Sequence, residues 1–343
     1  MTKYSFENDY SEGCHPKILE KLTTSTFEQQ DGYGDDEYSK EAAILIKNKL
    51  KNPGASVFFV TGGTQANLIV ISAVLRPHES VICAHTGHIH THEAGSIEAV
   101  GHKINAINSP DGKVRVTDIQ AVLDEHITIP HMVKPKMVYI SNASEVGTIY
   151  QKEELEALSA YCKKNDLYLF MDGARLGAAL CANNNDNTWE DIAKLTDIFY
   201  IGGTKNGALS GEAIVINNKI LATDFGYHLK QKGALTAKGR LQGIQFLALF
   251  EDNLFFELAQ HANTMAMKIT HAIEKKGYPF LTYSTTNQIF PILPNTVIDK
   301  LWEKYRFYVW QKIDSEHSAV RIVTSWATKE TAVDGFIKDL LEL

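Results

Sequence analysis

Short apolar runs alternate with helix-like segments through the first two-thirds of the chain. The helix-like segments begin at Gln65, Val116 and Lys152. The apolar runs are rich in β-branched and aromatic residues and predict buried strands at 56–60, 81–84, 137–141, 167–171, 197–201 and 212–216. Strands that alternate with helices are typical of a three-layer α/β/α domain, whose site lies beyond the carboxyl ends of parallel strands.

The pattern changes near Gly243. A long helical stretch follows, then strand-like pieces at 287–293 and 319–325 and a terminal helix from about Lys329. This order is typical of a smaller α+β unit, and 343 residues exceed what one hydrophobic core usually serves. We therefore expect an N-terminal segment, a large domain and a small C-terminal domain, at 1–15, 16–245 and 246–343.

The composition limits the partners of the chain. Hydrophobic residues make up 44% and charged residues 22%, which indicates a folded globular protein. The net charge is −7, and lysines and arginines are spread throughout the chain. The sequence therefore has no basic stripe of the kind that binds nucleic acid or an anionic membrane. No apolar run approaches the length of a bilayer span, the first residues lack an apolar signal region, and the four cysteines form no CxxC pair. We expect a cytoplasmic protein whose partners are small molecules and copies of itself.

Three predicted strand ends carry candidate chemistry, and the first is a glycine turn. The strand at 56–60 is followed by Thr61, Gly62 and Gly63, and a helix opens directly after them. Glycines allow close approach of an anion, and the helix start favours a phosphate. A tight turn with Thr64 as N-cap is an equally good interpretation of this motif alone. Neither GxGxxG nor GK[ST] is present, so a nicotinamide enzyme or a nucleoside triphosphatase is not supported.

The other two strand ends carry an aspartate and a lysine. Asp172 directly follows the run at 167–171, where a buried carboxylate must be paired. Arg175 could be its partner in a purely structural salt bridge, which stands as the alternative to a role in binding. Lys205 follows the run at 197–201 and two glycines. A lysine among small residues at a strand end can be desolvated, and the lowered pKa that results suits an amine that attacks a carbonyl.

An anion-binding turn, an aspartate and a lysine at the strand ends of one domain match the requirements of pyridoxal 5′-phosphate. This cofactor needs a phosphate site, a partner for its pyridinium nitrogen and an amine that attaches to its aldehyde. In this order, the motifs TGGTQANL, HEAG, DGARLG and TKNGAL resemble the threonine aldolase and aromatic amino acid β-eliminating lyase family. That family consists of fold type I pyridoxal-phosphate enzymes. The resemblance runs over nearly the full length, from ENDYSEG to AVRIVTSW.

The resemblance implies roles for individual residues. Lys205 attaches the cofactor covalently, and Asp172 keeps the ring nitrogen protonated. The whole implied cofactor-binding set is Gly62, Gly63, Thr64, His88, Asp172, Arg175, Thr204 and Lys205. The substrate carboxylate is assigned to Arg321, whose planar fork suits a bidentate contact. Arg175 and Asn8 fall where the family places further carboxylate contacts.

A histidine cluster lies in the stretch CAHTGHIHTHEAG. It contains His85, His88, His90 and His92. His88 and His92 have the spacing of two zinc ligands in an HExxH site, but Ile89 stands where the glutamate belongs. A metal-dependent hydrolase built on this cluster is the distant alternative, and we expect no metal. By the resemblance, His88 instead stacks on the cofactor ring and can move a proton, while the other three pack or face solvent.

One departure from the family concerns Glu145. Well-known threonine aldolases carry ENTHNG, with a histidine that engages the substrate β-hydroxyl, whereas this chain reads SNASEVGT and has Glu145 there. A carboxylate can accept the hydroxyl proton or recognise a different side chain. The expected reaction is retro-aldol cleavage of a β-hydroxy-α-amino acid of the L-threonine or L-allo-threonine type into glycine and an aldehyde. The catalytic set is Lys205, His88, Asp172 and Glu145.

Two other outcomes stay open. One is β-elimination from another β-substituted amino acid, and the other is a binding protein without turnover. Because the family usually completes its sites with a neighbouring subunit, the resemblance also implies a homodimer or a homotetramer. The segment around Tyr33 is the candidate interface.

Overall fold

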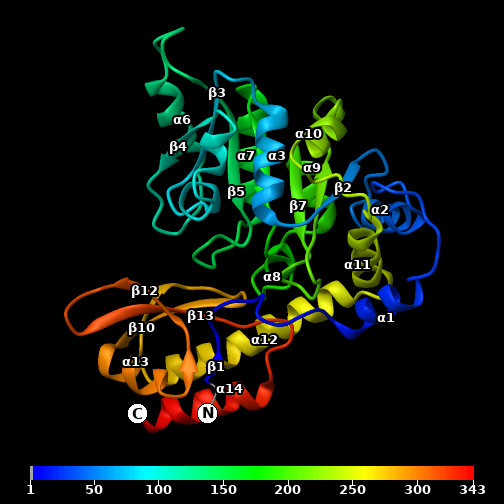
Figure 1. Ribbon diagram of the computed structural model, residues 1–343. Helices are drawn as coiled ribbons and strands as arrows, with labels where there is room; N and C mark the ends of the chain where they lie inside the picture. The colour runs from blue at the N-terminus through cyan, green and yellow to red at the C-terminus, as the bar shows by residue number, and fades with distance from the viewer. Residues whose placement is uncertain (1–2) are drawn as a thin grey trace.

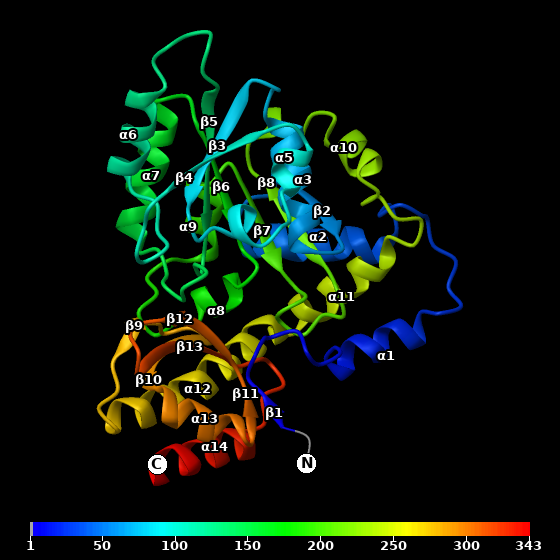
Figure 2. The ribbon, with the colours of Figure 1, turned by 60° about the vertical axis from the view of Figure 1, so that its left-hand side comes forward.

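The computed structural model describes residues 3–343 and arranges them in two units (Figure 1). The larger unit is built on a seven-stranded sheet and the smaller on a four-stranded one. Figures 1 and 2 both show the larger unit above the smaller, with β5 and β7 pointing towards the smaller unit. Within residues 3–343, no helix is both long enough and apolar enough to cross a bilayer.

The large sheet has the strand order β2-β8-β7-β6-β5-β3-β4. These strands are β2 (Ser56–Val60), β8 (Glu212–Ile216), β7 (Ile198–Gly202), β6 (Tyr168–Asp172), β5 (Lys134–Ser141), β3 (Glu79–Ala84) and β4 (Lys103–Ile107). All six predicted strands are present, and β4 is a strand that the sequence pattern did not indicate. Only β8 departs from the expected parallel arrangement, since it is antiparallel to both β2 and β7. The connection from β7 spans only residues 203–211, and a parallel crossover needs about a dozen or more.

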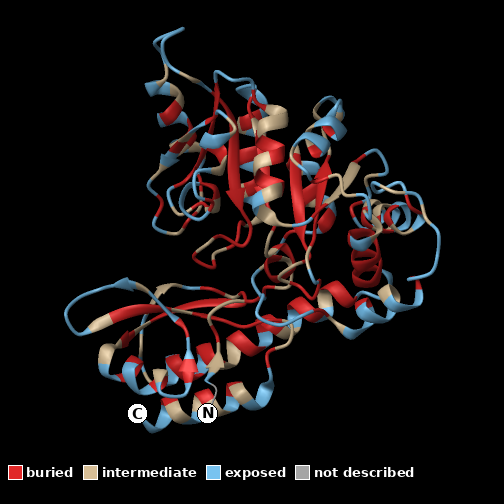
Figure 3. Ribbon diagram, in the orientation of Figure 1, coloured by how far each residue is buried: buried red, intermediate tan, exposed pale blue. Residues whose placement is uncertain are grey.

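Helices cover both faces of the large sheet, which confirms the predicted three-layer α/β/α fold. In β5, Met137 and Tyr139 face one layer, and Val138 and Ile140 face the other. The first layer contains α3 (Gly63–Val74), α5 (Ser96–Ala99) and α10 (Phe225–Gln231). The second contains α1 (Pro16–Thr24), α2 (Glu37–Lys49), α6 (Val116–Glu125), α7 (Lys152–Lys164), α9 (Trp189–Leu195) and α11 (Arg240–Glu251). Figure 3 shows the strands buried between these layers.

Short elements occupy the connections after β3, β6 and β8. They are α4 (His88–Thr91), α8 (Leu176–Leu180) and the 3-10 helix η1 (Lys219–Ala222). Longer helices begin at capping residues that the sequence supplies. At the start of α7, for example, the backbone N–H of Gln151 donates to the Glu154 carboxylate at 2.8 Å, which satisfies a donor that the helix itself leaves free.

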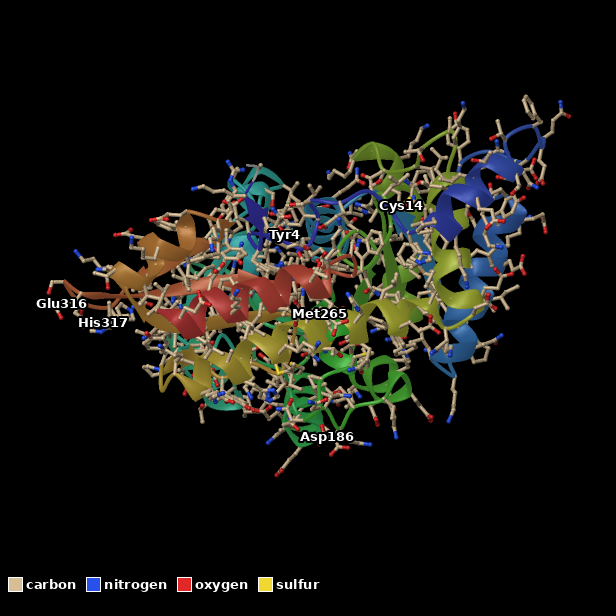
Figure 4. The ribbon with its side chains drawn as sticks, turned by 90° about the horizontal axis from the view of Figure 1, so that it is seen from below. Tyr4, Cys14, Asp186, Met265, Glu316 and His317 are labelled. Atoms are coloured by element: carbon tan, nitrogen blue, oxygen red, sulfur yellow. The ribbon has the colours of Figure 1, made fainter. Side chains whose placement is uncertain are left out.

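The small unit packs an antiparallel sheet of order β12-β13-β10-β9 against three helices. The elements are β9 (Phe280–Thr282), β10 (Gln288–Pro294), β12 (Tyr308–Lys312), β13 (His317–Val323), α12 (Leu254–Lys275), α13 (Asn295–Trp302) and α14 (Glu330–Glu342). Figure 4 shows α12, with Met265, beside α14, while the tip of the β12–β13 hairpin, with Glu316 and His317, projects outward. Helix α12 also reaches α8 of the large unit.

The N-terminal segment joins the two units. Its strand β1 (Tyr4–Ser5) pairs in parallel with β11 (Tyr305–Arg306) of the small unit, and the chain then crosses to α1 on the large unit. The predicted boundary at residue 245 falls within α11, which packs against α2. The first turns of α12 still belong to the large core, through Leu254, Phe255 and Leu258, so the chain changes unit along α12, after the break between α11 and α12. There, Asn253 has a φ of 63°, a left-handed conformation that asparagine tolerates and that interrupts the helical stretch.

Candidate active site

Two adjoining cavities lie where the carboxyl edge of the large sheet faces the small unit. The first, of about 560 Å³, has Tyr308, Trp310 and Arg321 of the small unit in its wall. The second, of about 360 Å³, is lined by the strand ends of the large sheet. The residues common to both are Tyr10, His88, His92, Glu145, Arg175 and Lys205. The cavities therefore form one site, and the three strand-end motifs meet in it.

Asp172 ends β6 and lines the second cavity, where it is almost completely buried. Its Oδ1 accepts a hydrogen bond from the Tyr200 hydroxyl at 2.5 Å, and its Oδ2 accepts one from the Tyr139 hydroxyl at 2.5 Å and one from Asn67 Nδ2 at 3.2 Å. Burial raises the pKa of this carboxyl, but the hydrogen bonds outweigh burial and hold the pKa below its usual value. Asp172 is therefore kept as a carboxylate that can pair with a cationic ring nitrogen.

The glycine turn follows β2 in the second cavity. Helix α3 begins at Gly63 with Gly62 as its N-cap, and no side chain caps it, so Thr64 lies inside the first turn and is not the N-cap. The N–H groups of this helix start therefore lack a side-chain acceptor, which favours a bound anion. A Cβ at Gly63 would lie 2.9 Å from the Tyr200 hydroxyl that binds Asp172. Glycine is thus needed for this close approach.

Thr204 and Lys205 lie in the short connection from β7 to β8. The hydroxyl of Thr204 accepts a hydrogen bond from the N–H of Gly211 at 2.9 Å, which closes the connection into a tight loop. Lys205 lines both cavities. Burial and the nearby Arg175 lower the pKa of the Lys205 ammonium, and this favours the neutral amine, which is the nucleophilic form.

Glu212 is a buried carboxyl at the same edge, and the sequence motifs did not reveal it. Its Oε2 accepts a hydrogen bond from the N–H of Gly203 at 3.0 Å, and burial raises its pKa well above the usual range. Had β8 been parallel as predicted, Glu212 at its amino end would lie at the opposite edge of the sheet. The antiparallel direction brings it to the cavity instead.

His88 opens α4 and lines both cavities. Its Nδ1 lies 2.7 Å from Oε1 of Glu93, whose side chain has no exposed surface. The ring stacks on that of His92, with centroids 5.6 Å apart and planes 21° apart. His92 is exposed, as expected, but it also lines both cavities, and partial burial together with the neighbouring His88 lowers its pKa.

The remaining two histidines of the cluster lie outside both cavities. His85 and His90 are exposed and line neither cavity, and His85 Nδ1 accepts a hydrogen bond from the N–H of Ser109 at 3.4 Å. Within the described range 3–343, no three or more side chains of histidine, cysteine, aspartate or glutamate are grouped as metal ligands would be. The geometry therefore gives no support to a metal-dependent hydrolase built on this cluster.

Glu145 reaches both cavities from the loop after β5. Its Oε1 accepts hydrogen bonds from the Ser141 hydroxyl at 2.6 Å and from the backbone N–H of His88 at 2.9 Å. Burial raises the pKa of this carboxyl by more than these hydrogen bonds lower it. A carboxylate with a raised pKa is a better proton acceptor, which suits a general base.

Arg321 enters the first cavity from β13 of the small unit. Its guanidinium lies over the rings of Tyr308 and Trp310, 5.3 and 5.5 Å from their centroids, and Nη2 donates to the backbone carbonyl of Glu7 at 3.2 Å. Its Nε is buried and has no hydrogen-bond partner among the described residues. A buried cationic donor without a partner is a binding point for an anion such as a carboxylate.

Arg175 pairs with Asp9 and not with Asp172. Its Nε donates to Asp9 Oδ2 at 2.7 Å and its Nη2 to Oδ1 at 3.0 Å. Asp9 is fully buried and also accepts a hydrogen bond from Asn287 of the small unit at 2.9 Å. The structural salt bridge allowed by the sequence therefore exists, but with a carboxylate from the N-terminal segment. Arg175 still lines both cavities.

Asn8 is not brought into either cavity. Its Oδ1 instead accepts hydrogen bonds from the backbone N–H of Tyr10 at 3.0 Å and from the Ser11 hydroxyl at 2.9 Å. Of the next two residues, Tyr10 lines both cavities, and Asp9 lies behind them, paired with Arg175. The motif ENDYSEG drew attention to this segment, but the residues within it that reach the cavity could not be chosen without the backbone path.

A lysine, an ionised aspartate and a glycine-turn helix start at one edge of a largely parallel sheet define the class of protein. The fold is that of the fold type I pyridoxal-phosphate enzymes. Aspartate aminotransferase of Thermus thermophilus shares this fold, with a TM-score of 0.73 over 99% of this chain and 91% of that one, at 14% identity.

Comparison with more similar proteins identifies the family. The family model described as beta-eliminating lyase matches residues 15–295. A low specificity L-threonine aldolase of a Pseudomonas species is 33% identical over 342 residues, which cover 98% of this chain and 96% of that protein. The structure of Leishmania major threonine aldolase superposes with a TM-score of 0.97 at 50% identity and covers 99% of each chain. The chain belongs to the β-eliminating lyase family.

Proposed function

We propose that this protein is a pyridoxal-phosphate-dependent lyase that cleaves a β-hydroxy-α-amino acid of the L-threonine or L-allo-threonine type into glycine and an aldehyde. The observation that carries the proposal is that Lys205 and Arg321 line one cavity of about 560 Å³. An amine that can attach the cofactor thereby faces a guanidinium that can hold the substrate carboxylate. Two Pseudomonas relatives named low specificity L-threonine aldolase, at 33% and 32% identity over 98% of this chain, support the reaction.

The donors of the second cavity fit the cofactor. Its phosphate would be held by the helix start at Gly62, Gly63 and Thr64, and by Thr204, which lines the same cavity. The ionised Asp172 would pair with the ring nitrogen, Lys205 would attach covalently and His88 would lie against the ring. When bound, pyridoxal phosphate supplies an electron sink for the bond that breaks at the substrate α-carbon.

The side chains of this protein supply orientation and proton transfer. Arg321 binds the substrate carboxylate and so orients the bonds at the α-carbon. The Glu145 carboxyl and the His88 imidazole lie in the walls of both cavities, and either can accept the β-hydroxyl proton. If the substrate carries a leaving group at the β-carbon instead, the Lys205 amine can remove the α-proton, and elimination follows.

The proposal extends to the state of the protein in the cell. We propose a homodimer or homotetramer, supported by a cavity of about 390 Å³ that has Tyr33, Phe58 and Leu235 in its wall beside the charged Asp35 and Lys40. A cytoplasmic location is supported by the four cysteines, which form no disulfide. The modest net charge of −7 favours a small amino acid over nucleic acid or a membrane as the partner.

The test is a product assay with the cofactor-loaded protein and Lys205→Ala as control. L-Threonine, L-allo-threonine, L-serine and an aromatic amino acid are offered, and aldehyde, glycine, oxo acid and ammonia are measured together. Aldehyde with equimolar glycine, absent from the variant, is the expected result. Oxo acid and ammonia without glycine would move the enzyme to β-elimination, and no product from any of the four would contradict the proposal.

A further inference from the structure

Glu93 is a buried carboxylate next to the site that the proposed reaction does not use. Its side chain has no exposed surface, although it lies between the short helices α4 and α5. Its Oε1 is 2.7 Å from His88 Nδ1 and accepts a hydrogen bond from Asn67 Nδ2 at 2.7 Å, and its Oε2 accepts one from the Ser96 hydroxyl at 2.8 Å. A carboxylate buried with this many directed contacts is held in one orientation.

The contact with Glu93 selects one form of the His88 ring. An ionised carboxylate only accepts hydrogen bonds, so the nitrogen 2.7 Å away must carry the proton. A neutral imidazole carries one proton, and placing it on Nδ1 leaves a lone pair on Nε2. Nε2 makes no hydrogen bond to any residue in the range 3–343, and the ring lines both cavities. The unprotonated nitrogen is therefore the one left available to a ligand.

A second chain of contacts ties this arrangement to Asp172. The Asn67 amide nitrogen lies 2.7 Å from Glu93 Oε1 and 3.2 Å from Asp172 Oδ2, so it donates towards both carboxylates. The Asn67 amide oxygen is buried and has no partner among the described residues. The amide is thus oriented by the two carboxylates, and the partner of the cofactor nitrogen and the partner of His88 are held by one buried side chain.

We propose that Glu93 is a positioning residue, which fixes the His88 ring with its proton on Nδ1 and thereby presents a basic Nε2 to the substrate. This inference rests on the proposed function, since it assigns the β-hydroxyl proton to His88. The His88 backbone is held independently, because its N–H donates to Glu145 Oε1 at 2.9 Å. Loss of the Glu93 charge should therefore change the protonation site of the ring while the chain keeps its path.

The first experiment measures the tautomer directly and needs no turnover. Cofactor-free protein labelled with 15N-histidine is studied by 15N NMR under alkaline conditions that leave imidazoles neutral, and His88→Asn identifies the signal. We expect a protonated Nδ1 and an unprotonated Nε2 in the wild type. In Glu93→Gln, the amide can donate as well as accept, so a population protonated on Nε2 should emerge. Glu98→Gln, an exposed glutamate of the same segment, is the matched control and should leave the signal unchanged.

The second experiment compares kcat and KM for L-threonine in the same variants. Glu93→Gln should lower kcat by about 10- to 100-fold and leave KM within about threefold of the wild type, because orientation of a proton acceptor acts on the transition state. Glu93→Ala should lower kcat further. Because Glu93→Gln is nearly isosteric with the wild type, it still tests the inference if the alanine variant does not fold.

Three results would overturn the inference. One is a wild-type His88 protonated on Nε2, and another is a Glu93→Gln variant whose tautomer and kcat both match the wild type. A variant with a lower melting temperature and an unchanged tautomer would assign Glu93 a purely structural role and would also contradict it. If the wild type cleaves none of the four amino acids, the proposed function fails, but the tautomer measurement still decides the role of Glu93.

Discussion

The guanidinium of Arg175 forms two hydrogen bonds with the fully buried carboxylate of Asp9, at 2.7 and 3.0 Å. Asp9 comes from the N-terminal segment and Arg175 from the large unit, and Asn287 of the small unit completes the contact at 2.9 Å. The three parts of the chain thus meet at one carboxylate beside the site. Arg175 lines both cavities, so its position there depends on Asp9.

Replacing this carboxylate should destabilise the protein in a pH-dependent manner. Asp9→Asn leaves the buried Arg175 charge without its counterion, and we expect a loss of about 3 kcal/mol of unfolding free energy at neutral pH. Burial raises the pKa of Asp9, but Arg175 outweighs burial and holds the pKa below its usual value. A lowered pKa contributes stability that is fully present above the unfolded-state pKa of about 4 and is lost as the pH falls through the folded-state value.

Urea unfolding of the wild type and Asp9→Asn, at neutral pH and at several values below 4, provides the measurement. The difference in stability should shrink as the pH falls. Asp252→Asn, which removes an exposed partner of Lys17, should leave the urea midpoint unchanged. A difference between wild type and Asp9→Asn that stayed constant down to the lowest pH would show that the ionised pair is not its source.

Glu145 offers a test of which group accepts the β-hydroxyl proton. Its pKa is raised by burial and partly restored by the 2.6 Å hydrogen bond from Ser141. If Glu145 is the base, Ser141→Ala should raise that pKa further and move the acid limb of kcat to higher pH by about half to one unit. In that case Glu145→Gln should also remove the limb and lower kcat by about 100-fold, whereas the exposed control Glu125→Gln should not. If His88 is the base, as inferred above, the acid limb should remain in Glu145→Gln.

The kinetic profiles of Glu145→Gln and Glu93→Gln distinguish the two candidate bases. Full activity in Glu145→Gln would assign the proton to His88 alone. A loss in both Glu145→Gln and Glu93→Gln would indicate that the two carboxyls act through the same imidazole, since Glu145 also binds the His88 backbone N–H.

Arg321 should affect substrate binding more than turnover. Its unpartnered Nε and planar fork suit a carboxylate, and a lysine can form only a point contact. Arg321→Lys should therefore raise KM for L-threonine by about 10- to 100-fold, the cost of one charge-assisted hydrogen bond. Arg115→Lys, at an arginine that pairs with Asp111 away from the site, is the control. An unchanged KM in Arg321→Lys would show that the carboxylate binds elsewhere.

The two glycines of the turn should differ in cofactor-free protein. A Cβ at Gly63 would lie 2.9 Å from the Tyr200 hydroxyl, whereas a Cβ at Gly62 meets nothing within 4 Å. Gly63→Ala should lower the melting temperature of the apoprotein and displace Tyr200 from Asp172, and the apparent Kd for pyridoxal phosphate should rise. Gly62→Ala should keep the melting temperature of the wild type. Equal melting temperatures for the two variants would contradict the close approach at Gly63.

Much of the large unit could be predicted from local pattern. Strands buried on both faces are continuous apolar runs, and all six predicted ones are present within a few residues of their expected bounds. The missed strand β4, KINAI, lies at the edge of the sheet, and Lys103 and Asn105 interrupt its apolar residues, so it forms no continuous apolar run. Motif order also placed Asp172 and Lys205 at neighbouring strand ends, because the end of an apolar run is visible in the sequence.

Other features depend on how distant segments meet. The direction of β8, which brings Glu212 to the site, follows from the length of one loop and was not apparent from the run EAIVI itself. Asp9 and Arg175 are 166 residues apart, and nothing in either local motif pairs them. The same is true of Asn67, whose amide lies between the carboxylate of Asp172, at the end of β6, and that of Glu93, in the connection after β3.

The sequence by itself determined the chemical inventory and its order: a glycine turn, a histidine cluster, an aspartate and a lysine at the ends of successive apolar runs. Local physics suffices for this, since burial, turn formation and helix starts depend on neighbouring residues. Only the tertiary structure decided which side chains face the cavity and in which form. Those properties depend on buried hydrogen bonds, such as those of Glu93 with His88 and of Tyr139 and Tyr200 with Asp172. Exclusion of water from these positions strengthens each hydrogen bond.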